Sequence, residues 1–210
     1  MGNREPLAPK EFYHIYNRGT DKRKIFDSRA DYERFLALLY LSNTTDSIHI
    51  NNHRHQGSTL VERLQIERAE PLVSIAAYCL MPNHFHLLIQ EHKEGGISKF
   101  MQKLITGYTM YYNIKNERSG TLFQGKFKSE HVGEDRYLKY LLAYIHLNPS
   151  KLGKPEQYIY SSYADFVGEK RLQGKILDTA VLPEYFPSPK SFKKEMKEWL
   201  KYRTEVEPRL

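Results

Sequence analysis

The sequence predicts an α+β domain in which an antiparallel sheet carries its helices on one face. Three observations support this prediction. Two apolar stretches, residues 72–80 and 84–90, are separated only by a short turn, which is typical of an antiparallel hairpin. Three other segments have apolar residues at helical spacing. The predicted elements follow the order strand, helix, strand, strand, helix, strand, helix, and this mixture favours an antiparallel sheet with helices packed on it.

Four segments are expected to form the strands. Residues 11–16, EFYHIY, alternate loosely and are rich in aromatic side chains. Residues 72–80, LVSIAAYCL, lead into a turn at 81–83 and then into residues 84–90, HFHLLIQ. Residues 126–132, KFKSEHV, place their two lysines on one face of a strand and the phenylalanine on the other.

Three helices are expected between and after these strands. Residues 29–41 and 97–115 repeat apolar side chains at i, i+3, i+4 and i+7, which indicates one buried stripe on each helix. Residues 134–147 show the same pattern. Pro149 ends this helix because a proline disfavours helical geometry at the preceding residue, Asn148.

Beyond this domain, assigned to residues 1–168, we expect a C-terminal extension over residues 169–210. Residues 189–203, PKSFKKEMKEWLKYR, predict a basic amphipathic helix, which either docks on the domain surface or contacts DNA. Residues 43–70 form a polar insertion, predicted to be a long loop with a short helix near residues 60–68. Three histidines of this insertion have no ligand partners at a recognisable spacing, so a solvated loop is expected for them: His49, His53 and His55.

The composition favours a phosphate-bearing partner. Lys and Arg number 32 against 25 Asp and Glu, for a formal net charge of +7 and a pI near 9.3, and such side chains displace the counterions condensed on nucleic acid. Charge alone does not exclude a basic protein without an anionic partner. The single cysteine, Cys79, cannot form an internal disulfide and fits a reducing compartment. Because the sequence shows no secretory signal and no run near the ~18 apolar residues of a membrane span, we expect a cytoplasmic protein without membrane contact.

Two histidines on the strand at residues 84–90 are the first candidates for chemistry. His84 and His86 are two residues apart, so a strand points both to one side and Phe85 to the other. Two imidazoles on one face can bind a single metal ion, and they need a polar partner because the rest of the strand is apolar. A histidine pair alone is a weak signal, so a second observation is needed.

The helix at residues 134–147 supplies that second observation. Tyr144 and Asn148 are four residues apart and therefore lie over one helix face. The side-chain carbonyl of Asn148 is a hard oxygen ligand, and two imidazoles with one amide oxygen leave octahedral positions open for phosphate oxygens and water. Such a set suits Mg²⁺ or Mn²⁺. Tyr144 by itself would be interpreted as a packing residue, but beside a metal ion its hydroxyl is a candidate nucleophile.

Together these motifs resemble the IS200-like, single-tyrosine transposases of the HUH class, and in particular their REP-associated branch. AYCLMPNHFHLLIQ, which holds His84 and His86, is similar to the HUH motif, and YIHLNPSKLG, which begins at Tyr144, is similar to the tyrosine motif. Three further segments resemble that branch: YNRG at 16–19, LFQGKFKS at 122–129 and YSSYADFVG at 160–168. The resemblance runs in order over about residues 11–168.

The resemblance implies a role for each matched residue. His84 and His86 match the metal ligands, Tyr144 matches the nucleophile, and Asn148 matches the position where related transposases carry a metal-binding glutamine. The implied fold is the ferredoxin-like antiparallel sheet of the HUH endonucleases, with helices on one face. The implied cofactor is a divalent metal, Mg²⁺ or Mn²⁺. The sequence departs from the family pattern in the long insertion at 43–70 and in the C-terminal extension.

The implied activity is cleavage and transfer of single-stranded DNA beside a DNA hairpin. Attack by the tyrosine on a phosphate gives a 5′-phosphotyrosine and a free 3′-hydroxyl, which can reverse the step or join another strand. The candidates for DNA contact are Asn17, Arg18, Lys126 and Lys128, although each lysine is also compatible with a solvated surface charge. The sequence is compatible with a monomer or a homodimer, and with a tyrosine that works in its own subunit or in a partner's.

Three other functions are compatible with parts of the sequence. A catalytically inactive nucleic-acid-binding module of the same fold, acting as a repressor or RNA-binding protein, is disfavoured because both histidines, the tyrosine and the amide are present. A zinc-bearing structural protein is disfavoured because one cysteine and a distant amide are a poor zinc set. An RNA endonuclease without a covalent intermediate would require the 2′-hydroxyl of its substrate.

Overall fold

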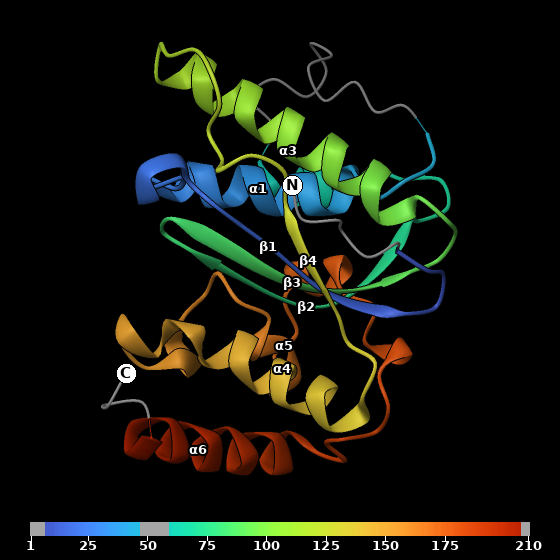
Figure 1. Ribbon diagram of the computed structural model, residues 1–210, viewed down its shortest axis with the longest axis vertical. Coiled ribbons are helices and arrows are strands. Elements are labelled where there is room, and N and C mark those ends of the chain that lie inside the picture. The colour runs from blue at the N-terminus through green and yellow to red at the C-terminus, as the bar shows by residue number, and fades with distance from the viewer. Residues whose placement is uncertain (1–6, 47–58, 207–210) are drawn as a thin grey trace.

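The computed structural model describes residues 7–46 and 59–206, which are arranged around a four-stranded antiparallel sheet (Figure 1). The strand order is β2-β3-β1-β4, with β1 at Phe12–Arg18, β2 at Val73–Met81, β3 at His84–Glu91 and β4 at Lys128–His131. β2 and β3 form the predicted hairpin, and β1 lies antiparallel between β3 and β4. The α+β class and the antiparallel sheet predicted from the sequence are therefore confirmed.

The predicted helices are present, including the one in the C-terminal extension. The helices are α1 at Arg29–Leu41, α2 at Leu60–Leu64, α3 at Gly96–Lys115, α4 at Asp135–Leu147, α5 at Tyr163–Phe166 and α6 at Pro189–Val206. Short 3₁₀ turns lie at Thr20–Lys22, Asn148–Lys151, Pro155–Gln157, Leu172–Ile176 and Thr179–Val181. No helix within the described ranges is both long and apolar enough to cross a bilayer.

The helices cover both faces of the sheet, which corrects the expectation that they lie on one face. In Figure 1, α1 and α3 lie on one side of the sheet, and α4 and α6 lie on the other. The reason is visible in β2, whose 9 residues are all buried, because a strand without a solvent-facing side chain needs cover on both faces. Phe85 and Leu87 pack in the core below α1 and α3, whereas Ala77 and Leu88 pack with α4.

Alternation along the strands separates this core from a polar face. Ile15 of β1 and Phe85 of β3 pack in the core formed with α1 and α3. Because neighbouring side chains of a strand point to opposite faces, His14 and His86 point toward α4. Both imidazoles meet the ring of Tyr144 there. The α4 face of the sheet therefore brings together polar side chains from β1, β3 and α4.

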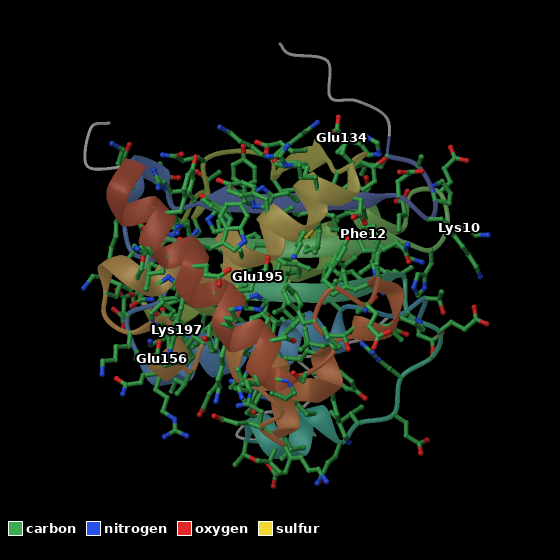
Figure 2. All side chains as sticks on the ribbon, turned by 90° about the horizontal axis from the view of Figure 1, so that it is seen from below. Lys10, Phe12, Glu134, Glu156, Glu195 and Lys197 are labelled. Atoms are coloured by element: carbon green, nitrogen blue, oxygen red, sulfur yellow. The ribbon has the colours of Figure 1, made fainter. Side chains whose placement is uncertain are left out.

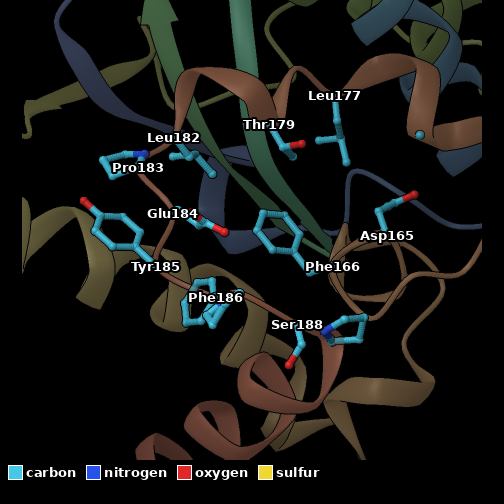
Figure 3. Close-up of a pocket in the computed structure, with 13 residues that line it drawn as sticks. Asp165, Phe166, Leu177, Thr179, Leu182, Pro183, Glu184, Tyr185, Phe186 and Ser188 are labelled. Atoms are coloured by element: carbon cyan, nitrogen blue, oxygen red, sulfur yellow. The ribbon is translucent and has the colours of Figure 1, made fainter.

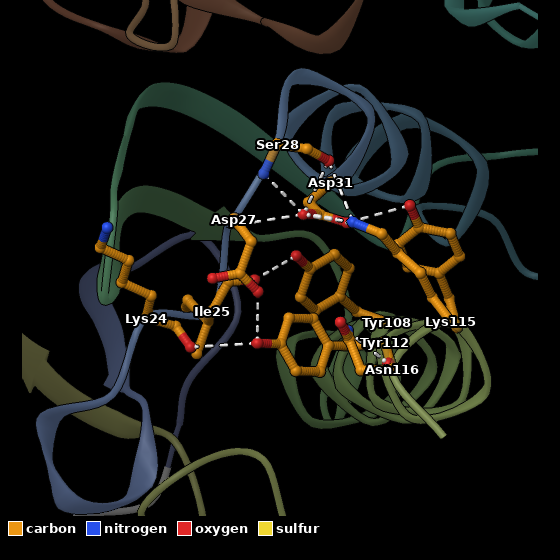
Figure 4. Close-up of polar contacts among 10 residues, drawn as sticks. Lys24, Ile25, Asp27, Ser28, Asp31, Tyr108, Tyr112, Lys115 and Asn116 are labelled. Atoms are coloured by element: carbon orange, nitrogen blue, oxygen red, sulfur yellow. Dashed lines mark hydrogen bonds and ion pairs between the residues drawn. The ribbon is translucent and has the colours of Figure 1, made fainter. Parts of the chain in front are cut away.

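A buried carboxylate fixes the start of α1 against α3 (Figure 4). Asp31 is 0% exposed, and its Oδ2 accepts hydrogen bonds from the backbone N and the Oγ of Ser28 at 2.8 and 3.0 Å, which satisfies donors at the helix start. Nζ of Lys115 on α3 lies 2.7 Å from Oδ1 of Asp31. Burial raises the pKa of Asp31, but hydrogen bonds from Lys115, the Asp27 N–H, Ser28 and Tyr111 outweigh it and hold the pKa below its ordinary value.

The polar insertion at 43–70 starts with a buried residue that is tied to the sheet. Asn43 is 1% exposed; its Nδ2 donates to the carbonyl of Val73 at 2.8 Å, and its Oδ1 accepts from the N–H of Leu72 and Val73 at 2.9 and 3.0 Å. The amide thereby supplies partners for backbone groups on the outer edge of β2. The short helix expected near residues 60–68 is α2. His49, His53 and His55 lie outside the described residues.

The C-terminal extension packs on the α4 side of the sheet. α6 lies across α4 and forms the outermost layer of this side (Figure 2). Its apolar residues Phe192 and Met196 are buried, and Nζ of Lys139 on α4 lies 2.7 Å from Oε1 of Glu195. The basic amphipathic helix therefore docks on the domain, and this docking is compatible with the alternative expectation that it contacts DNA.

Candidate functional site

The two predicted histidines of β3 lie together beneath α4. Their ring centroids are 5.0 Å apart and their planes are nearly perpendicular. Phe85 between them is buried on the opposite face, as the alternation of the sequence predicts. His84 is partly buried and His86 is 6% exposed, so each needs a polar partner.

Hydrogen bonds fix the protonation of His84. Its Nδ1 lies 2.6 Å from Oδ1 of Asn83, and Nδ2 of Asn83 donates to the carbonyl of Lys22. Because Oδ1 of Asn83 can only accept, Nδ1 of His84 carries the proton and Nε2 carries a lone pair. Burial lowers the pKa of His84, partly opposed by the contact with Asn148, so the imidazole is neutral at pH 7.

Asn148, the third predicted ligand, lies beside His84. Its Oδ1 lies 3.3 Å from Nε2 of His84. Two acceptors therefore face each other, and a cation between such atoms satisfies both lone pairs. Among the described residues there is no group of three or more His, Cys, Asp and Glu side chains arranged for a metal, so two histidines and this amide are the donors that the chain offers here. Neutral imidazole and a carbonyl oxygen fit Mg²⁺ or Mn²⁺ with phosphate oxygens and water in the other positions.

A third histidine, His14 of β1, was not predicted and lies directly behind His86. Nε2 of His14 is 2.8 Å from Nδ1 of His86, and Nδ1 of His14 is 3.6 Å from Oε2 of Glu130 on β4. The carboxylate favours a proton on Nδ1 of His14, so Nε2 of His14 accepts from Nδ1 of His86. This leaves Nε2 of His86 with its lone pair available for a metal, as carboxylate–histidine chains do in other metal sites.

The surroundings keep His86 neutral. Burial lowers its pKa well below the ordinary value, and His14, His84 and Arg18 lower it further. Burial also lowers the pKa of His14, and Glu130 opposes that shift. A neutral imidazole is the form that binds a metal ion, so the environment of His86 prepares it for that role.

Glu130 connects three elements around these histidines. Its Oε1 accepts a hydrogen bond from Tyr16 of β1 at 2.8 Å, and its Oε2 accepts one from Tyr137 of α4 at 3.3 Å. Burial raises the pKa of Glu130, but the hydrogen bond from Tyr16 and the neighbouring His14 outweigh it and lower the pKa. Burial and the bond to Glu130 raise the pKa of Tyr16 to about 12. Both tyrosines therefore keep their phenol protons, which they donate to the carboxylate in hydrogen bonds, and are poor nucleophiles.

Tyr144 reaches the histidines from α4. Its ring centroid is 5.4 Å from that of His86 with the planes at 88°, and 6.0 Å from that of His14 at 77°. Asn148 follows the last residue of α4 and still has helical dihedral angles. Tyr144 and Asn148 therefore lie one turn apart on the same side of the helix, beside His86 and His84, respectively.

Arg203 of α6 is a second site residue that the sequence did not reveal. Its guanidinium carbon lies 5.8 Å from the ring centroid of Tyr144. Its Nη1 donates to the carbonyl of Leu147 at 3.2 Å, at the end of α4, where carbonyl groups lack partners within the helix. The C-terminal extension thus contributes a positive charge beside the candidate nucleophile.

The four side chains predicted to contact DNA do not lie in one place. Arg18 pairs across the sheet with His84, and Lys128 pairs with Tyr16, whose ring lies 5.9 Å from Nζ of Lys128. Lys126 is exposed and precedes β4, which is shorter than the strand predicted at 126–132. Arg18 and Lys128 therefore belong to the polar face, and Lys126 belongs to the loop beside it.

The prediction that Asn17 contacts a base of the DNA is corrected by the structure. It is 4% exposed, its Nδ2 donates to the carbonyl of Gly125 at 3.2 Å, and its Oδ1 accepts from the N–H of Arg18 at 2.8 Å. It also points away from the histidines, because Arg18 beside it points toward them. Its side chain holds the loop before β4 instead of presenting its amide to a base edge.

A separate cavity of about 480 Å³ lies between α5 and the C-terminal extension, away from the histidines (Figure 3). Phe166, Leu177 and Phe186 line it together with Asp165 and Glu184. None of the predicted site residues lines it. The chemistry available to the chain is therefore concentrated on the polar face under α4, where metal-binding side chains and a tyrosine converge.

Comparison with known proteins identifies the family and a solved structure with the same fold. The family model described as "Transposase IS200 like" matches residues 12–148, a range that begins with β1 and ends at Asn148. A solved structure described as a REP-associated tyrosine transposase bound to a REP hairpin has the same fold, with a TM-score of 0.55 at 13% identity, over 89% of this chain and 99% of that chain. Among curated proteins no significant match was found.

Proposed function

Because this chain belongs to the IS200-like transposase family, we propose that it is a metal-dependent endonuclease and strand transferase for single-stranded DNA, with Tyr144 as its nucleophile. The observation that carries the proposal is the meeting of Tyr144 with His86 and of Asn148 with His84 within one chain. Tyr144 is favoured over its neighbours Tyr16 and Tyr137, whose hydroxyls donate to Glu130.

The proposed reaction is a transfer of one phosphodiester bond. Oη of Tyr144 attacks the phosphorus, an O–P bond to the tyrosine forms, and the bond from phosphorus to the 3′-oxygen breaks. The phenol loses its proton and the leaving 3′-oxygen gains one, which gives a 5′-phosphotyrosine and a free 3′-hydroxyl. Because the phosphotyrosine conserves the bond energy, a 3′-hydroxyl can reverse the step or join a different strand.

The protein side chains have distinct tasks in this reaction. His84, His86 and Asn148 would hold Mg²⁺ or Mn²⁺, which when bound polarises the scissile phosphate and offsets the charge that develops on its oxygens. Arg203 places its positive charge over the ring of Tyr144, beside the attacking group. Arg18, opposite His84, binds the phosphate beside the cleaved one.

The proposed substrate is a single strand next to a DNA hairpin. A phenol on a helix that faces a sheet reaches a phosphate only if the backbone is splayed, as it is in unpaired DNA. The related structure that shares this fold was described in complex with a REP hairpin, which makes a hairpin the first substrate to test. Lys128 at the sheet edge and Lys126 in the loop before it are the proposed contacts to the hairpin backbone.

A covalent adduct tests the proposal. The protein is incubated with a labelled single-stranded DNA library that contains hairpins, in Mg²⁺ or Mn²⁺, and analysed on a denaturing gel. We expect a labelled protein band that disappears in Tyr144→Phe and with chelator, and that persists in the matched control Tyr185→Phe, since Tyr185 bonds to Asp135 away from the histidines. DNA binding without any adduct would contradict the proposal and favour a non-catalytic nucleic-acid-binding module.

A further inference from the structure

A groove lined by aromatic rings runs between α4 and α6. It has a volume of about 870 Å³, and Tyr137 and Tyr140 of α4 face Trp199 and Tyr202 of α6 across it. Tyr140 is 37% exposed and Tyr202 is 55% exposed. In Figure 2, α6 crosses in front of α4, with Glu195 labelled on α6 and Glu134 labelled near the start of α4. Large rings exposed in a groove cost hydrophobic free energy unless a partner covers them.

The rings are spaced as a continuous series. The Tyr137 and Tyr140 centroids are 6.1 Å apart with nearly parallel planes, and the Tyr140 and Trp199 centroids are 5.4 Å apart. Tyr202 lies 5.9 Å from Trp199. Within each helix this spacing follows from the sequence, because residues three apart on a helix lie on the same face. The contact of Tyr140 with Trp199 depends instead on the packing of α6 on α4.

The series leads to the candidate nucleophile. The Tyr140 centroid is 6.3 Å from that of Tyr144, one helical turn away. Arg203, which follows Tyr202 on α6, lies over the Tyr144 ring. A strand that places its phosphate at Tyr144 therefore has the aromatic groove as a direct continuation of its path.

The charges around the groove limit which ligands it accepts. Glu134, Glu195 and Glu198 line it together with Arg136. Glu195 is paired with Lys139 at 2.7 Å, and Glu198 lies 3.9 Å from Lys194. These carboxylates disfavour the dense phosphates of a duplex inside the groove, but they can accept hydrogen bonds from the N–H groups of bases.

We propose that this groove is a binding site for the unpaired nucleotides that flank the cleaved phosphate, with the bases stacked on Tyr140, Trp199 and Tyr202 and the phosphates directed outward. The proposal deepens the proposed function and rests on it for the identity of the ligand. Tyr137 and Tyr144 are separated by roughly 10 Å along the helix. That length holds about three nucleotides at the ~3.4 Å rise of stacked bases.

The single tryptophan of the chain makes the groove directly observable. Because Trp199 is the only tryptophan, its fluorescence reports on this groove and on no other part of the protein. The full-length protein is titrated in EDTA, which prevents metal-dependent cleavage, with three probes. These are the single strand dT10, an abasic strand with the same number of phosphates, and a ten-base-pair dA·dT duplex. We expect saturable quenching by dT10 and little quenching by the other two.

Variants of the groove tyrosines test whether the quenching by dT10 comes from bases stacked on the aromatic rings. Tyr140→Ala and Tyr202→Ala are each expected to weaken dT10 binding about five-fold or more, the loss of one base–aromatic stack. Tyr202 is 55% exposed, so its removal leaves the core intact. Ile114→Ala is the matched control, because Ile114 is a large exposed side chain on α3, across the sheet. Equal quenching by the abasic strand, or unchanged dT10 affinity in both tyrosine variants, would overturn the proposal.

The result of this titration can be distinguished from the result of the adduct assay that tests the proposed function. The titration is carried out in EDTA, where the proposed metal-dependent cleavage does not occur, so the quenching does not depend on formation of the adduct. A Tyr144-dependent adduct without base-dependent quenching would reject the groove and keep the nuclease. Base-dependent quenching without an adduct would reject the nuclease and keep the groove as a site for unpaired DNA.

Discussion

The ring of Tyr144 stands edge-on to the ring of His86, with 5.4 Å between the centroids and 88° between the planes. Both residues belong to the same chain, and α4 carries the tyrosine to the sheet without help from a second subunit. The candidate nucleophile and the candidate metal ligands are thus assembled within one subunit.

This arrangement predicts that the tyrosine acts in its own subunit. Tyr144→Phe and His86→Ala should each fail to form the covalent adduct. A mixture of the two should also fail, because no subunit of any mixed oligomer holds both a tyrosine and an intact histidine pair. The mixture is assayed on the denaturing gel after incubation long enough for subunit exchange, and recovery of the adduct would show that the tyrosine works in a partner's site.

The contact of His14 with His86 predicts that His14 sets the metal affinity. His14→Ala should weaken Mn²⁺ binding by about 10–100-fold, the usual effect of removing a side chain that orients a ligand. Electron paramagnetic resonance of free Mn²⁺ measures this in the absence of DNA. The control His131→Ala, from the exposed pair of His131 with Glu11 at 2.8 Å, should leave the affinity unchanged. An unchanged affinity in His14→Ala would refute the role of His14.

Arg18, opposite His84, should bind a phosphate of the substrate strand. Arg18→Ala should weaken DNA binding and reduce the slope of log affinity against log salt by about 0.7, the value for one phosphate of a single strand. Lys93→Ala serves as the control, because Lys93 pairs with Glu70 in an exposed ion pair remote from the histidines. A slope that is the same in Arg18→Ala and in the unmodified chain would exclude this phosphate contact.

Asp31 should stabilise the fold in a pH-dependent way. Asp31→Asn leaves Lys115 without its carboxylate and should cost about 3 kcal/mol of unfolding free energy at pH 7. Because the folded pKa of Asp31 lies below its ordinary value of 3.8, this contribution is present above that pH and is lost as the pH falls through the lower folded pKa. The difference between the two proteins in urea unfolding should therefore shrink at pH 3.

The exposed ion pair of Arg29 with Glu33 provides the control for that experiment. Glu33→Gln removes a pair whose arginine is 81% exposed, and it should cost less than about 1 kcal/mol. A loss in Asp31→Asn no larger than this would show that the buried carboxylate does not join α1 to α3 energetically.

Local patterns in the sequence were sufficient to predict most elements and to bring together the main residues of the candidate site. The helical period predicts α1 at residues 29–41, and the structure has it at Arg29–Leu41. The spacing of two between His84 and His86 and of four between Tyr144 and Asn148 determines which side chains share a face. Each of these relations depends on a single element, so its geometry can be derived before the fold is known.

Relations between elements were missed. The register that places His14 behind His86 and Glu130 beside His14 depends on how β1 pairs with β3 and β4, and no local pattern specifies it. Arg203 reaches Tyr144 only because α6 folds back over α4. Two of the errors could have been avoided from the sequence. The alternation that turns Arg18 toward the histidines turns Asn17 away from them. The largely apolar sequence of β2 indicates that helices cover both faces of the sheet.

The identity of the tyrosine joined to DNA tests the central claim most directly. Trypsin cleavage after Lys139 and Lys151 releases residues 140–151, YLLAYIHLNPSK, which contain both Tyr140 and Tyr144. Fragmentation of this peptide after nuclease trimming of the adduct distinguishes the two positions. The account predicts a nucleotide phosphate on Tyr144, whereas a nucleotide on Tyr140, on Tyr16 or on any other residue would contradict it.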